Sequence, residues 1–158
     1  MADVLLTTFR FRVVLRVQDA SGRSNNLAEK GGFQECSGLD IDLDVQEYME
    51  GGRNDRVVRR VGRAKYSPIV LKRGMFQSEG ALYRTIWTWI QSISRGERPV
   101  RRCDGLIEVL GDEGAVTARW EFDRALPMKV AGPRLDARTG EVAIEELHLA
   151  HEALRLVE

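Results

Sequence analysis

Hydrophobic and polar residues alternate along much of the chain with the period of two that is typical of β-strands. From Phe9 to Val17 every second residue is hydrophobic, and arginine fills most of the positions between. Residues 39–45 and 116–123 alternate in the same way, and shorter apolar runs at 69–72 and 106–110 are bounded by proline or glycine. The pattern therefore predicts a mainly β protein.

One segment, residues 79–95, has the spacing of an amphipathic helix instead. Ser78 is suited to cap its start, and Gly96 follows its end. The hydrophobic residues that share one side of this helix are Leu82, Ile86, Trp89, Ile90 and Ile93. Tyr83 and Trp87 widen that side beyond what covering one sheet requires. We therefore expect part of the helix to face a second surface, such as another subunit.

The C-terminal segment from Val142 to Val157 fits two patterns. A helix would align Ile144, Leu147, His151 and Leu154 on one face, whereas short strands would pair Val142 with Ile144 and Leu147 with Leu149. Periodicity alone slightly favours the helix.

Length and composition are those of a single domain covering residues 1–158. The chain has 158 residues, of which 43% are hydrophobic, enough for a core that needs no metal or disulfide. Lys and Arg together number 24, as do Asp and Glu, so there is no basic excess of the kind that nucleic-acid binding usually brings. No apolar run is long enough to span a membrane. Cys36 and Cys103, without a secretory leader, indicate reduced thiols in a cytoplasm.

Motifs for metal or nucleophilic chemistry are incomplete. Asp40, Asp42 and Asp44 have the spacing that opens a calcium loop, but Val45 and Gly51 stand where that loop needs glycine and glutamate. The three aspartates are better interpreted as the solvent or partner face of a strand. No cofactor is expected.

The two histidines carry the remaining enzyme hypothesis. Around Cys36, the sequence QECSG imitates a cysteine-protease signature, but that class has its histidine upstream, and His148 and His151 lie far downstream. On a helix the two histidines would share a face and bind zinc with a third ligand; on a strand they would point to opposite faces. A metal-dependent hydrolase using His148, His151 and a carboxylate therefore stays an alternative.

Arginine clusters support the other alternative, a standalone β-barrel module for nucleic acid. They are Arg53, Arg56, Arg59, Arg60 and Arg63, followed by Arg98, Arg101 and Arg102. Because acidic residues are interleaved among them, a solvated or subunit-facing surface is the favoured interpretation.

The order of these segments resembles the tail-tube protein family of contractile phages and related contractile injection systems. The resemblance runs from Phe9 through nearly the whole chain. Its segments are FQECSGL from Phe33, EYMEGGRN from Glu47, IVLKRG from Ile69, the helix with Trp87 and Trp89, WEF at Trp120, ALPMK from Ala125 with Gly132-Pro133, VAIE from Val142 and LAHE from Leu149.

The resemblance implies a tail-tube-like β-barrel or sandwich with one flanking α-helix, and it favours strands for the C-terminal segment. It implies a structural protein rather than an enzyme: an inner-tube subunit whose hexameric rings stack around a hollow lumen for cargo, including a specialised baseplate-proximal ring that starts the tube. Its partners would be other copies of itself, a contractile sheath protein and baseplate, hub or adaptor proteins. Such a protein assembles in the cytoplasm and becomes part of a phage tail or a released phage-tail-like particle.

Within this framework the sequence EYMEGGRND predicts the turn of a long hairpin arm, at about residues 46–66, that reaches a neighbouring subunit. Glycine tolerates the backbone conformation of such a bend. The expected interface residues are Glu50, Gly51, Gly52, Arg53, Asn54, Asp55, Val57 and Val58. Asp40, Asp42 and Asp44 are predicted to line the lumen, with an ordinary solvated face as the alternative.

Overall fold

The structure, a computed structural model, describes residues 5–6, 10–18, 24–26, 33–52, 55–75 and 82–157. Its elements, in chain order, are β1 (Phe11–Gln18), β2 (Ser24–Asn26), β3 (Glu35–Ser37), β4 (Ile41–Tyr48), β5 (Val58–Tyr66), β6 (Ile69–Gly74), α1 (Leu82–Ser94), β7 (Cys103–Leu110), β8 (Val116–Ala131), β9 (Ile144–Ala150) and β10 (Ala153–Leu156).

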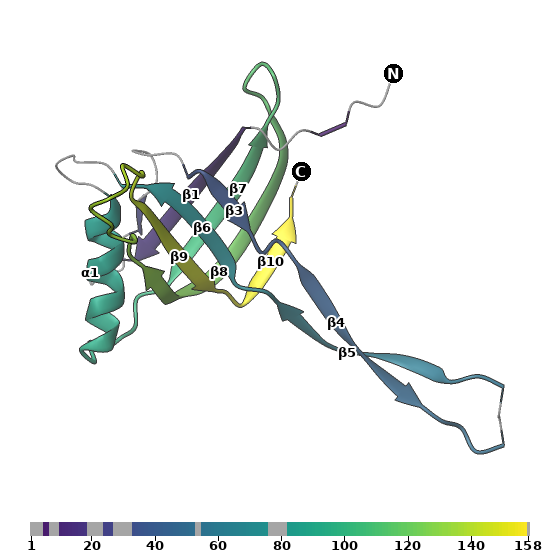
Figure 1. The fold of residues 1–158 in the computed structure, drawn as a ribbon. Coiled ribbons are helices and arrows are strands. Elements are labelled where there is room, and N and C mark those ends of the chain that lie inside the picture. Colours follow the sequence, from purple (N-terminus) through teal and green to yellow (C-terminus); the bar gives the residue numbers. More distant parts are fainter. Residues whose placement is uncertain are drawn as a thin grey trace.

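All but two of these strands form one antiparallel sheet in the order β2-β1-β7-β8-β9-β6-β3, with β10 also pairing with β8. The sheet curls into a body, and α1 lies along one side of it (Figure 1). Strands β4 and β5 pair only with each other and project from the opposite side of the body as a long ribbon. The mainly β fold with one flanking helix is thus confirmed.

The long strand β8 bends the sheet. Its first half pairs with β7 on one side and β10 on the other, and its second half pairs with β9. At the bend the register with β7 shifts, and Arg124 adopts a φ of 52°. The Arg124 N–H donates a hydrogen bond of 2.8 Å to Asp104 Oδ1, which satisfies a backbone group that the irregular pairing frees.

Inward-facing residues of the curled sheet form the core. Val13, Leu15 and Val17 of β1 are buried, as their alternation predicts, and Phe122 of β8 is fully buried among them. Burying one such side chain stabilises the fold by roughly 1.5–3 kcal/mol. The buried core therefore comes from the body, with Tyr66 at the base of the ribbon packed against it.

Helix α1 covers the core with Ile86 and Trp89, both buried. The Trp89 indole N–H donates to the Arg101 carbonyl at 2.9 Å, which ties the helix to the segment leading into β7. Gly96 ends the helix with a φ of 88°, as its sequence position predicts. Ser78 and residues 79–81 lie outside the described residues. No helix in the described ranges is long and apolar enough to cross a membrane.

The helix that periodicity slightly favours at the C-terminus is wrong, since this segment forms β9 and β10. Leu147 and Leu149 are buried at a spacing of two between β6 and β8. Leu147 and Leu154, which a helix would place on one face, belong to different strands. The strands implied by the family resemblance are therefore correct.

Candidate assembly surface

The most prominent functional feature is the ribbon of β4 and β5, which we call the arm. Its register pairs Ile41 with Tyr66 near the body and Tyr48 with Val58 near the tip. The register shifts between Leu43 and Val45, so Asp44 faces both Gly62 and Arg63. A side chain on Gly62 would lie 2.9 Å from the Asp44 Cβ, so glycine permits this close approach.

One face of the arm is apolar and uncovered. Alternation along β4 places Ile41, Leu43 and Val45 on the same face, where the register adds Val61 of β5. Their exposed fractions are 54%, 55%, 59% and 74%, respectively. An apolar row of this kind, left exposed, marks a contact surface. We call these four residues the apolar row.

The opposite face of the arm is polar. Asp42 is exposed, and the Asp44 carboxylate lies 3.0 Å from Lys65 Nζ. Asp40, just before β4, is also exposed. Of the three aspartates predicted to line a lumen, Asp42 and Asp44 therefore lie away from the apolar row, and Asp44 is partly neutralised by Lys65.

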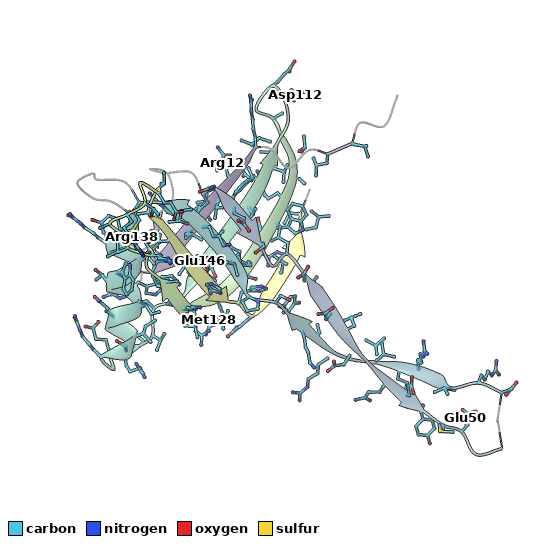
Figure 2. The ribbon with its side chains drawn as sticks, in the orientation of Figure 1. Arg12, Glu50, Asp112, Met128, Arg138 and Glu146 are labelled. Atoms are coloured by element: carbon cyan, nitrogen blue, oxygen red, sulfur yellow. The ribbon has the colours of Figure 1, made fainter. Side chains whose placement is uncertain are left out.

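The tip of the arm contains the predicted turn. Gly51 and Gly52 form it, Gly52 has a φ of 92°, and a Cβ added to either would meet nothing within 4 Å. Glu50 lies near the far end of the arm, away from the body (Figure 2). Asp55 is exposed, Val57 is 42% exposed, and Val58 is half-buried at the start of β5. Arg53 and Asn54 lie outside the described residues.

The arm leaves the body at a tightly packed junction. Gly38, with a φ of 91°, precedes β4, and a Cβ on it would lie 2.0 Å from the Pro68 carbonyl oxygen. On the returning side, His151 Nε2 is 3.2 Å from the Ser67 carbonyl oxygen, and its ring packs on Tyr66 with centroids 5.2 Å apart. Burial lowers the pKa of His151. A packed junction of this kind fixes the direction of the arm.

The two histidines have separate partners. His148 Nε2 lies 3.1 Å from Glu146 Oε2, and this hydrogen bond is the main reason that the pKa of Glu146 is lowered. His151 instead packs at the arm junction. Among the described residues, no group of three or more His, Cys, Asp or Glu side chains is placed to hold a metal ion.

The hydrophobic pattern of the sequence does not by itself identify the apolar row as a contact surface. Alternation shows that a strand has an apolar side, but it does not show what covers that side. In β1 the cover is the chain's own core, whereas none of the residues that the structure describes covers the apolar row on the arm. One sequence feature could have indicated this surface: apolar residues alternate with acidic ones, and the segment leads into a double-glycine turn.

A β body with one flanking helix and a projecting two-stranded arm is the fold of a tail-tube-type protein. The chain belongs to the family of the T4-like virus tail tube protein gp19, whose model matches residues 7–155. This confirms the resemblance seen in the sequence. The family is one of structural tube components, and the chain is a tube-type protein of contractile tails and injection systems.

Solved structures with the same fold come from contractile particles. The anti-feeding prophage cap, a tube-terminating cap, matches with a TM-score of 0.77 and 23% identity over 99% of this chain and 93% of the other. The anti-feeding prophage baseplate structure matches with a TM-score of 0.76 and 22% identity, over 99% of this chain and 97% of the other. The PVC sheath-tube complex, from an extracellular contractile injection system, matches with a TM-score of 0.75 and 25% identity, over 97% of this chain and 91% of the other. No curated protein matches the chain.

Proposed function

We propose that this chain is an inner-tube subunit that closes into hexameric rings, and that the rings stack into a hollow tube inside a contractile sheath. The observation that carries the proposal is the apolar row on the arm, in a chain of the tail-tube family. A surface that meets a different surface of the next copy builds rings when the rotation closes and filaments when it does not. Rings with a second such surface can therefore stack.

The arm is the proposed contact between subunits. Its tip offers the residues Glu50, Gly51, Gly52, Arg53, Asn54, Asp55, Val57 and Val58. Charged and amide side chains at the tip can form charge-assisted hydrogen bonds with a neighbour. Val57 and the apolar row are exposed in the single chain, and contact with a neighbouring subunit would remove these apolar side chains from water.

Asp40, Asp42 and Asp44 are proposed to face the lumen. Asp42 and Asp44 lie on the polar side of the arm, Asp40 is exposed just before it, and contact of the apolar row with a neighbouring subunit leaves that side available to water. Carboxylates at this wall repel a polyanionic cargo, while basic residues of β5 on the same face, such as Lys65 opposite Asp42, offset part of that repulsion. The Asp44–Lys65 pair moderates this charge.

The sheath, the baseplate or hub and the cargo are the proposed partners, and assembly in the cytoplasm precedes release in a particle. The baseplate-proximal ring that starts the tube is the second candidate position. It is favoured by the likeness to a solved baseplate structure, which covers 97% of that chain.

Negative-stain microscopy of the purified protein tests the proposal. We expect rings with sixfold symmetry and stacks of such rings with an open centre. The Gly51→Val/Gly52→Val variant and, separately, Arg53→Glu are expected to stay folded but to lose rings and stacks. Gly51→Ala is the matched control, because that position has open space and no positive φ. A wild-type protein that remains monomeric would overturn the tube function. Tip variants that assemble normally would overturn the role of the arm tip as a subunit contact.

A further inference from the structure

The arm sorts its charges by strand. The charged residues of β4 are Asp42, Asp44 and Glu47, all acidic. Those of β5 are Arg59, Arg60, Arg63 and Lys65, all basic. A ribbon of two strands therefore has one acidic edge and one basic edge, in a chain whose formal net charge is zero.

Contacts inside the arm use only some of these charges. Lys65 pairs with Asp44 at 3.0 Å, and Arg59 lies 3.8 Å from Glu47. The Arg60 guanidinium instead stacks on Tyr48, with its carbon 5.2 Å from the ring centroid. The side chains of Asp42 on one strand and Arg63 on the other make no ion pair or hydrogen bond with the part of the chain that the structure describes. Each edge thus retains a charged side chain that no described residue pairs.

Both long edges of the arm also retain unpaired backbone groups. Among the described residues, β4 and β5 form a sheet of two strands with no further neighbour. An edge of this length is a template for pairing with another strand, and basic residues on an edge discourage pairing with an identical edge. Here the opposite edge carries the complementary sign.

We propose that the arms of successive copies lie side by side, with the acidic edge of β4 in one copy paired to the basic edge of β5 in the next. This inference rests on the proposed ring of subunits. In a head-to-tail ring all arms point the same way relative to the ring, so β4 and the neighbour's β5 run antiparallel, as they do within one arm. The result is a continuous sheet in which acidic and basic strands alternate.

The faces of the arm match under this arrangement. The Ile41, Leu43 and Val45 side of β4 adjoins the Val61 side of the neighbouring β5. On the other face, Asp42 and Asp44 adjoin basic residues of the neighbour. A twofold arrangement would instead place acidic edge against acidic edge, or basic against basic, where like charges repel. The charge sorting therefore selects the head-to-tail order.

Charge reversal of the two unpaired residues tests the pairing in the full-length chain. Asp42→Lys and Arg63→Glu are each expected to raise the protein concentration needed for ring or tube formation by about tenfold, because each places like charges across the boundary. Asp42→Glu and Arg63→Lys keep the sign of charge and are expected to assemble like wild type. Circular dichroism verifies that all variants are folded.

Mixing the two reversed variants separates contacts between copies from contacts within one copy. An equimolar mixture of Asp42→Lys and Arg63→Glu chains restores complementary edges only between different chains, so assembly is expected to recover in the mixture. If the single reversals assemble like wild type, or if mixing gives no recovery, the edge pairing is wrong while the tube function stands. If wild-type protein forms no rings at all, both the edge pairing and the proposed tube function are wrong.

Discussion

Gly105 of β7 lies directly against the ring of Phe122 in β8. A Cβ on Gly105 would be 2.3 Å from Phe122 Cζ and 2.9 Å from the Val14 carbonyl oxygen. Phe122 is fully buried, so its ring has no open direction in which to move. The absence of a side chain at this one position lets the largest fully buried side chain of the core fit beside the β8 bend.

Gly105→Ala is therefore expected to destabilise the subunit by roughly 1–3 kcal/mol through overpacking. Urea unfolding followed by tryptophan fluorescence, at concentrations that keep subunits dissociated, measures the change. Gly140→Ala is the matched control, since an added Cβ there meets nothing within 4 Å. Equal stability of the two variants would show that the core accommodates the extra methyl group.

Trp89→Phe is expected to loosen the attachment of α1. The substitution removes the 2.9 Å hydrogen bond to the Arg101 carbonyl and leaves that acceptor without its partner, at a cost of about 1–3 kcal/mol. Trp87→Phe is the control, because Trp87 is only half-buried and packs near Gly132. Thermal unfolding by circular dichroism should show a clearly larger drop for Trp89→Phe; equal drops would contradict the role of the hydrogen bond.

Local sequence pattern predicts those strands that bury one face in the core and expose the other. Val13, Leu15 and Val17 alternate in β1 and are buried as expected. The C-terminal segment was ambiguous because β9 has seven residues and β10 has four, lengths over which periods of 2 and 3.6 are hard to separate. Pairing with β6 and β8, which no local pattern reports, resolves it as strand.

The sequence predicts the turn at the tip of the arm, but it does not predict the exposed apolar row. Two adjacent glycines located the bend of the arm because glycine tolerates positive φ, and Gly52 adopts it. The apolar row could not be recognised, because its exposure depends on the arm projecting from the body. The buried pair of Arg73 and Glu145 was likewise hidden, since charged residues are ordinarily assigned to the surface.

Both thiols are expected to be unreactive in the folded subunit. Burial raises the pKa of Cys36 and that of Cys103 to about 12. At pH 8 only about one thiol in 10⁴ is then the reactive thiolate. A chromogenic disulfide reagent should label neither cysteine over minutes in native buffer and both in guanidinium chloride, and a Cys36→Ala variant assigns the signals. Fast native labelling of Cys103 would contradict its burial, and fast native labelling of the half-buried Cys36 would contradict its raised pKa.

Arg73 and Glu145 form an ion pair inside the body, and removing one partner should be costly. Both side chains are only 3% exposed, and Arg73 Nε lies 4.0 Å from Glu145 Oε1. Arg73→Met leaves the Glu145 carboxylate buried without its cationic neighbour, which costs roughly 3–5 kcal/mol at neutral pH. Urea unfolding at pH 7 measures this loss. A Lys72→Met variant, whose partners Glu35 and Glu146 are partly exposed, is the control and should lose far less.

The same pair predicts how stability depends on pH. Burial raises the pKa of Glu145, and the charge of Arg73 only partly offsets this. The folded state therefore holds the proton more tightly than the unfolded state, so this group's contribution to stability is complete at low pH and is lost as pH rises through the raised pKa. Glu145→Gln has nearly the same shape and cannot ionise. Measured by urea unfolding from about pH 4 to about pH 7, the free energy of unfolding of wild type should fall relative to that of Glu145→Gln. A difference that stays constant over this range, or that changes in the opposite direction, would show that Glu145 ionises in the folded body as readily as in the unfolded chain.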